Sequence, residues 1–200
     1  LASTPLVLVA GPGLQAASVA QLLAQAKAAP GTLNFASNGN GSASHLATEL
    51  LAKMAGVRFR HVPYKATGQM TTDLVSGQVQ FAALGLVTAQ SLVQAGKLRA
   101  LAVTGPRATT LLPGVPAVAE TVPGYAARAW MGLVAPAGAP DAVAAKVQAD
   151  AAAAMRSPAV QAAMAAQGLD TELLDATQFA QRIESDIRTW REIVREAGVQ

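Results

Sequence analysis

Strand-like and helical patterns alternate through the first hundred residues, and this alternation restricts the possible fold more than any other feature. Apolar runs typical of strands cover residues 5–10, 33–36, 57–62, 79–84 and 98–104. The four segments between them have the apolar spacing of helices, with serine or glycine residues at several of their ends. Strands that alternate with helices indicate an α/β domain with a mostly parallel sheet.

The second part of the chain has a different organisation. Residues 105–124 form an irregular connection rich in proline and glycine, and a strand is predicted at residues 130–136. Three helices are predicted to follow, at residues 140–156, 157–168 and 175–197. The last helix carries an apolar stripe that must pack against a partner, formed by Phe179, Ile183, Ile187, Trp190 and Val194. These helices have only one predicted strand of their own to cover.

The composition excludes several classes of protein. With 52% hydrophobic residues and a net charge of +3, the chain is expected to fold rather than to remain disordered. No apolar run approaches the ~18 residues of a membrane span, and the absence of cysteine excludes disulfides and thiolate metal sites. Only two histidines are present, so no metal site is predicted, and no cofactor is expected. The basic residues are scattered rather than interleaved with aromatics, which argues against nucleic-acid binding. Their excess is either incidental or a field that favours a small anion.

The clearest binding signal lies at residues 33–46, LNFASNGNGSASHL. A short strand runs into a loop rich in glycine and serine, which opens a helix whose free N–H groups favour an anion. Gly39 and Gly41 allow a ligand to approach the backbone, and Ser37, Ser42 and Ser44 offer hydroxyl groups. The alternative interpretation is a glycine-rich turn in which Ser42 caps the helix.

A second predicted cluster, HVPYK, ends the next strand at residues 61–65. In open α/β sheets ligands bind beyond the carboxyl ends of the strands, so the strand ends at Ser37, Pro63, Leu84 and Thr104 are expected at one rim. Two helix N-termini there, with Tyr64 and Lys65, would suit a carboxylate. His45 either caps the first loop or faces the ligand.

Catalysis is not expected. The dinucleotide fingerprint, the P-loop and the nucleophile elbow are all absent. A triad of Ser42, His61 and Asp73 can be drawn, but nothing in the spacing selects it.

Six segments of the chain resemble one known family. In order, they are ASNGNGSASHLATELL, HVPYK, GQVQFAAL, AGKLRALAV, LPGVPAVAE and GLVAPAGAP. They resemble the Bug (Bordetella uptake gene) proteins, the TctC-like solute-binding components of tripartite tricarboxylate transporters, and the resemblance covers essentially all 200 residues. It implies an α/β, periplasmic-binding-protein-like (type II) architecture with two lobes. Residues 1–125 would form a complete lobe, and residues 126–200 the C-terminal part of the other lobe.

The resemblance also implies a function. An exported periplasmic protein would bind a small organic acid in the cleft between the lobes and present it to membrane subunits, without performing a reaction. The ligand-binding residues implied are Ser37, Asn38, Gly39, Gly41, Ser42, His45, Tyr64, Lys65 and Gly85.

The sequence departs from the family pattern at three places. Ala66 and Gln69 replace a glycine and a proline of the second loop, and Leu84-Gly85 replaces an Asp-Asn pair whose acid could contact a ligand amino group. The first residues match a point well inside the family's fold, and no signal peptide precedes them, so a truncated or degenerate fragment that does not bind ligand is one alternative. An esterase-like hydrolase is another. We also expect the exposed apolar stripe to drive self-association, for example as a homodimer through residues 128–200.

Overall fold

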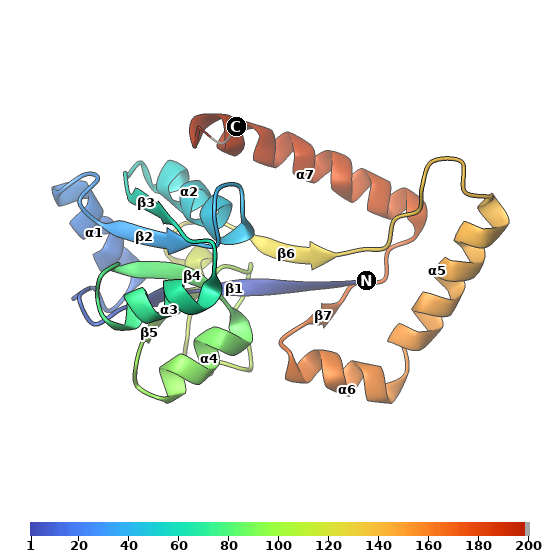
Figure 1. The fold of residues 1–200 in the computed structure, drawn as a ribbon, viewed down its shortest axis with the longest axis horizontal. Coiled ribbons are helices and arrows are strands. Elements are labelled where there is room, and N and C mark those ends of the chain that lie inside the picture. The colour runs from blue at the N-terminus through green and yellow to red at the C-terminus, as the bar shows by residue number, and fades with distance from the viewer. Residues whose placement is uncertain (199–200) are drawn as a thin grey trace.

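The structure, a computed structural model, describes residues 1–198, and a mixed sheet forms its centre (Figure 1). Five strands lie in the order β3-β2-β4-β1-β5. Their bounds are β1 (Ala2–Ala10), β2 (Asn34–Ser37), β3 (Arg60–Pro63), β4 (Phe81–Gly85) and β5 (Arg99–Val103). β2 is parallel to β3 and β4, whereas β1 is antiparallel to both β4 and β5. Since β5 is also opposite to β1, the strands β2, β3, β4 and β5 share one direction. The prediction of a mostly parallel sheet is right for these four strands and wrong for β1.

The apolar pattern of β1 explains this error. Leu8 and Ala10 face one hydrophobic core, and Val7 and Val9 face the other, so both faces of the strand are buried. A strand that is buried on both faces has a continuous apolar run whichever way it points, because the pattern reports burial and not direction.

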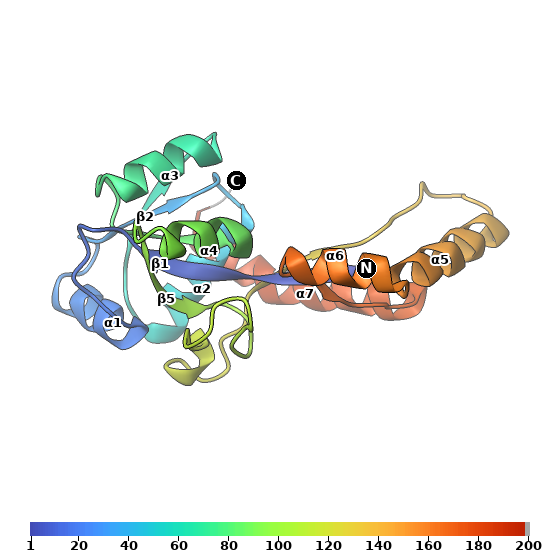
Figure 2. The ribbon, with the colours of Figure 1, turned by 90° about the horizontal axis from the view of Figure 1, so that it is seen from below.

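Four helices cover the two faces of this sheet. They are α1 (Val19–Ala28), α2 (Ala43–Ala55), α3 (Thr67–Val75) and α4 (Leu86–Gln94). Residues of α1 and α2 belong to one core, and residues of α3 and α4 to the other, so the pairs lie on opposite faces (Figure 2). The predicted N-caps Ser18 and Ser42 both accept a hydrogen bond from the third helical residue, and Gly56 ends α2 with a φ of 63°.

The second part of the chain is built on the other end of β1. Residues Ala2–Pro5 pair with β6 (Arg128–Met131), and Ala2 and Ser3 pair with β7 (Asp170–Thr171). The predicted strand at residues 130–136 thus ends five residues early. Met131 pairs with Ala2, so the ladder ends where β1 begins, and the segment beyond it is exposed. β1 therefore belongs to both parts, whereas the predicted division at residues 125/126 assigns it to the first part alone.

Three helices complete the fold, and they are less buried than those of the first part. They are α5 (Asp141–Met155), α6 (Pro158–Ala166) and α7 (Ala176–Glu196), and a short 3-10 helix precedes β6 at Val118–Glu120. α5 and α6 bury no residue, and they lie beyond the end of the five-stranded sheet (Figure 1). No helix within residues 1–198 is long and apolar enough to cross a membrane.

α7 connects the two parts of the molecule. Its predicted capping box of Asp175 and Gln178 is confirmed. At its C-terminal end, Trp190 packs on the core of the first part, and Ile193, which the predicted stripe omits, is buried. Ile187 of the predicted stripe remains 50% exposed. The other four residues of the stripe are half-buried, so the stripe is covered toward both ends and open in its middle.

Candidate functional site

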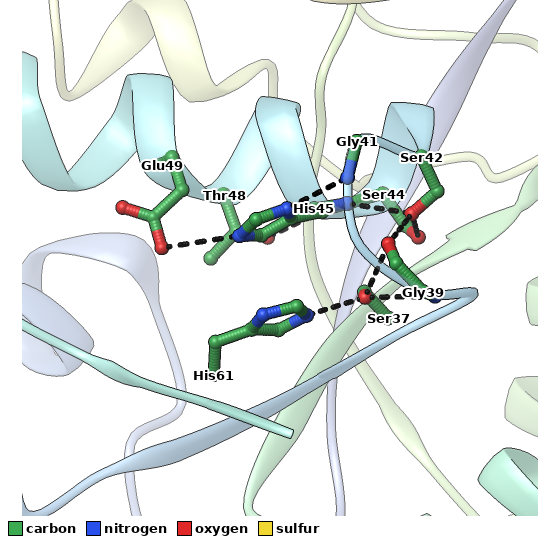
Figure 3. A network of polar contacts seen from close by, with 9 residues as sticks. All are labelled: Ser37, Gly39, Gly41, Ser42, Ser44, His45, Thr48, Glu49 and His61. Atoms are coloured by element: carbon green, nitrogen blue, oxygen red, sulfur yellow. Dashed lines mark hydrogen bonds and ion pairs between the residues drawn. The ribbon is translucent and has the colours of Figure 1, made fainter. Parts of the chain in front are cut away.

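The loop between β2 and α2 has a fixed internal geometry (Figure 3). Gly39 and Gly41 have φ angles of 106° and 74°, a region that favours glycine. The hydroxyl of Ser42 donates to Gly39 O at 2.7 Å and accepts from His45 N at 3.3 Å. The backbone N–H of Asn38 donates to Ser44 Oγ at 3.0 Å. Serine side chains thus bond both ends of the loop to the first turn of α2.

The first turn of α2 leaves two amide groups free. Within the described residues 1–198, the N–H groups of Ala43 and Ser44 donate to no protein acceptor. They lie at the positive end of a 13-residue helix, next to a loop whose conformation is already fixed. Such a helix N-terminus favours a carboxylate or another small anion.

Two histidines lie beneath this loop (Figure 3). His45 is buried, and its Nδ1 accepts a hydrogen bond from Gly41 N at 3.1 Å. His61 Nε2 lies 2.6 Å from Ser37 Oγ, and the two imidazole rings stack with centroids 3.7 Å apart. Burial, together with the neighbouring His45, lowers the pKa of His61 to about 4, and Glu49 opposes this shift. His45 therefore holds the loop from within the protein and is not placed to contact a ligand.

The second predicted loop lies beside the first. Tyr64 N donates to Ser37 O at 2.9 Å, and the Thr67 hydroxyl donates to Asn38 Oδ1 at 3.3 Å. The hydroxyl of Tyr64 donates to Asp73 at 2.8 Å, and burial together with this contact raises the pKa of Tyr64 to about 12. Lys65 is exposed.

The expected rim is only partly formed as predicted. β2, β3 and β4 run in the same direction, so their carboxyl ends, at Ser37, Pro63 and Gly85, lie at one edge of the sheet. Gly85 is exposed there and is the N-cap of α4. Thr104 is instead buried, and its hydroxyl donates to Ala127 O at 2.7 Å. It joins the two parts of the chain rather than facing a ligand.

A pocket of about 230 Å³ opens next to the N-terminus of α2. Its lining includes Gly41 and Ala43 together with Arg128 of β6 and Trp190 of α7. The guanidinium of Arg128 forms an ion pair with Asp170, while its Nε is buried and has no hydrogen-bond partner among residues 1–198. Sequence reasoning missed Arg128, because a single arginine at a strand start carries no distinctive pattern.

The geometry does not support nucleophilic catalysis. His61 bonds to Ser37 and not to Ser42, and Asp73 bonds to Tyr64, so the triad of Ser42, His61 and Asp73 does not exist. Ser37 is completely buried, and its hydroxyl also contacts both backbone groups of Gly39. Within residues 1–198 no group of three or more candidate ligands could hold a metal ion.

Comparison with known proteins gives a consistent result. Residues 1–199 match the model of the tripartite tricarboxylate transporter family receptor. The chain is 35% identical over 197 residues to protein BugT of Bordetella pertussis, covering 98% of this chain and 60% of BugT. It is 34% identical to a UPF0065 protein from the tcbD-tcbE intergenic region of Pseudomonas sp. strain P51, covering 98% of this chain and 59% of that protein. The chain thus spans about 60% of the length of these curated relatives.

Solved structures show the same fold. Rpa4515 of R. palustris with adipate superimposes with a TM-score of 0.87 at 30% identity, covering 100% of this chain and 67% of that chain. MatC (Rpa3494) from Rhodopseudomonas palustris with bound malate gives a TM-score of 0.82 at 27% identity, covering 97% and 67%. The periplasmic binding protein BugD gives 0.83 at 26% identity, covering 100% and 68%. The predicted fold class, a periplasmic-binding-protein-like α/β chain with one complete lobe and part of a second, is confirmed.

Proposed function

Because the chain belongs to the tripartite tricarboxylate transporter receptor family, as its six motifs predict, we propose that it captures a small organic carboxylate for a transporter of this type. The ligand would bind between the lobe formed by residues 1–125 and the part formed by residues 126–200. The protein would act in the periplasm and present its ligand to membrane subunits. The family model is described as a receptor and BugD as a periplasmic binding protein, which supports a binding role without catalysis.

The observation that carries this proposal is the N-terminus of α2. Within residues 1–198 the N–H groups of Ala43 and Ser44 have no protein acceptor, and the loop before them is already ordered. A carboxylate bound there would gain two charge-assisted hydrogen bonds without the cost of ordering the loop. Two structural neighbours are described with dicarboxylates, adipate and malate, which supports the same ligand class here.

We assign the proposed site residues two roles. Ser37 and His45 are buried and would support the loop from below. The remaining residues would line the ligand side, namely Asn38, Gly39, Gly41, Ser42, Tyr64, Lys65 and Gly85.

Calorimetry tests the site directly. Gly41→Val strains a backbone with a φ of 74°, and Ser42→Pro removes both the cap and the N–H that donates to Gly39 O. Both should weaken the binding of adipate, malate or any other carboxylate that the protein binds. Gly96→Val is the matched control, since Gly96 has a φ of 67° and no atom within 4 Å of its added Cβ. Unchanged affinity in both loop variants would refute the assignment.

A second candidate is a chain that folds but does not bind ligand. The observation that favours it is that the chain matches only about 60% of its curated relatives. The absence of binding to the 200-residue chain, with normal binding to a chain of the relatives' length, would support this candidate.

A further inference from the structure

The two glycines of the proposed binding loop are held by a pair of stacked histidines. His45 contacts the second glycine directly, through Gly41 N at 3.1 Å. His61 contacts the first indirectly, since Ser37 Oγ lies 2.6 Å from His61 Nε2 and accepts from Gly39 N at 3.1 Å. The rings lie 8° from parallel (Figure 3). We infer that His45 is a pH-sensitive positioning residue, which holds the loop ready for a carboxylate only while its ring is neutral.

The hydrogen bonds fix the protonation state of His45. A backbone N–H can only donate, so Nδ1 of His45 must carry a lone pair to accept from Gly41. The ring proton then lies on Nε2, which faces Glu49 Oε1 at 3.6 Å. Protonation would place a second proton on Nδ1, directed at the N–H of Gly41. Two donors would then face each other, and the contact would be lost.

His61 directs an added proton toward His45. Stacked rings 3.7 Å apart cannot both carry a charge without strong repulsion, so only one of them would hold an added proton. Glu49 on α2 is the one carboxylate within ion-pair distance of either ring among residues 1–198, and it lies beside His45. The hydrogen bond between His61 and Ser37 can run in either direction. If His61 Nε2 carries a proton and donates, the Ser37 hydroxyl accepts it and donates to Gly39 O. The bond from Gly41 to His45 is therefore the acid-sensitive one.

Release of Gly41 would affect the proposed site immediately. Gly41 precedes the cap Ser42 and lies two residues before Ala43, whose N–H would bind the carboxylate. A loop that is no longer held must be ordered again on binding, which weakens affinity. This effect on affinity rests on the proposed function, whereas the response of the loop to pH does not.

Nuclear magnetic resonance tests the device without a ligand. In the 200-residue chain at pH 7.5, the imidazole nitrogen shifts of His45 should show Nδ1 unprotonated and Nε2 protonated. On titration to pH 5, the Gly41 amide resonance should move together with the His45 ring, while the Gly96 amide does not. His45→Asn should abolish this movement, because an asparagine Oδ1 can accept from Gly41 but cannot titrate. A protonated Nδ1 at pH 7.5, or a Gly41 amide that ignores the titration, would overturn the inference.

Calorimetry with adipate tests the consequence for binding. For the wild type and for His45→Asn, the association constant at pH 7.5 is divided by that at pH 5.5. Protonation of adipate itself affects both ratios equally and therefore cancels. The wild-type ratio should exceed that of the variant by about tenfold, the effect of one hydrogen bond. Equal ratios would overturn the inference. If neither protein binds adipate or malate at pH 7.5, the proposed function fails for these acids, and the spectroscopic titration still decides the role of His45.

Discussion

The hydroxyl of Tyr64 donates a 2.8 Å hydrogen bond to Oδ2 of Asp73 on α3. Tyr64 belongs to the second predicted binding loop, yet its polar atom is engaged within its own lobe. Burial and the adjacent carboxylate both disfavour the tyrosinate, which raises the pKa of Tyr64 to about 12. What remains for a ligand is the half-buried ring.

Tyr64→Phe should therefore act first on stability. It leaves the Asp73 carboxylate without its donor, and the free energy of unfolding should fall by about 1 kcal/mol. Tyr64→Ala, which also removes the ring, should weaken carboxylate binding more than Tyr64→Phe does. Urea denaturation and calorimetry measure the two effects. Equal losses of affinity in the two variants would mean that the hydroxyl, and not the ring, contacts the ligand.

Stability should depend on pH through His61. The folded-state pKa of His61 is about 4, below its ordinary value of 6.5, so between these values the unfolded chain binds more protons than the folded one. The contribution of His61 is fully present above pH 6.5 and is lost as pH falls toward 4. Through His61, the free energy of unfolding changes by at most about 1.4 kcal/mol per pH unit, and by less here because solvent reaches the ring.

His61→Gln removes this titration while leaving a polar group near Ser37. Urea denaturation at pH 4.5, 5.5 and 7 should give a shallower decline for the variant than for the wild type. Parallel curves would show that His61 does not keep its low pKa in the folded protein.

Local signals in the sequence predicted the local structure well. Ser18, Ser42 and Asp175 cap their helices as expected, because each cap depends only on residues within one turn. The direction of β1 and the end of β6 were not predicted, since both depend on pairing between distant segments.

The candidate site shows the same division. The sequence predicts the glycine-rich loop and the free helix N-terminus, which are contiguous features. The stacking of His45 on His61 joins α2 to β3, and the contact of Trp190 with the pocket joins α7 to α2. No spacing along the chain reports these contacts.

The proposed site should prefer ligands that lack an ammonium group. The resemblance to the Bug family implies an Asp-Asn pair at the positions of Leu84 and Gly85, and Leu84 is buried near the end of β4. An ammonium group in a closed cleft would lose its hydration without gaining an anion. In a thermal-shift screen, dicarboxylates should stabilise the protein more than acidic amino acids of matched length. Replacing Gly85 with aspartate should narrow this difference, and a reversed order in the wild type would contradict the prediction.

Gly132 should not tolerate a side chain. A Cβ at this position would lie 2.3 Å from Cζ of Phe179, whose ring meets Trp130 edge-on with centroids 5.3 Å apart. Gly132→Ala must displace the phenyl ring, which should cost about 1–3 kcal/mol of stability and change the fluorescence of Trp130.

The control is Gly68→Ala in α3, where nothing lies within 4 Å of the added Cβ. It should raise stability slightly, because alanine favours the helix. In a Phe179→Leu background the cost of Gly132→Ala should shrink, since the two residues are in contact. An unchanged cost would place the strain elsewhere.

We propose that the chain self-associates through residues 128–200. Nine large hydrophobic side chains are exposed among residues 1–198, and seven of them lie in this region. The seven are Met131, Leu133, Val134, Val143, Val147, Leu174 and Ile187. Trp190 is not available for this purpose, because it packs on the core of the first part. The contact would therefore involve the exposed face of α5, the middle of α7 and the exposed segment that follows β6.

Val143 and Val147 lie one turn apart on α5 and are 55% and 48% exposed, and Ile187 on α7 is 50% exposed. Burying the exposed half of each such side chain contributes on the order of 1 kcal/mol, so several together favour a dimer at micromolar concentration. Light scattering on the 200-residue chain should show a mass above that of a monomer. Val143→Ser with Ile187→Ser should lower this mass, whereas Val87→Ser, at a 38% exposed position in the first part, should not. A monomer at high micromolar concentration would refute the prediction. An effect of Val87→Ser as large as that of the double variant would show that the contact is not confined to residues 128–200.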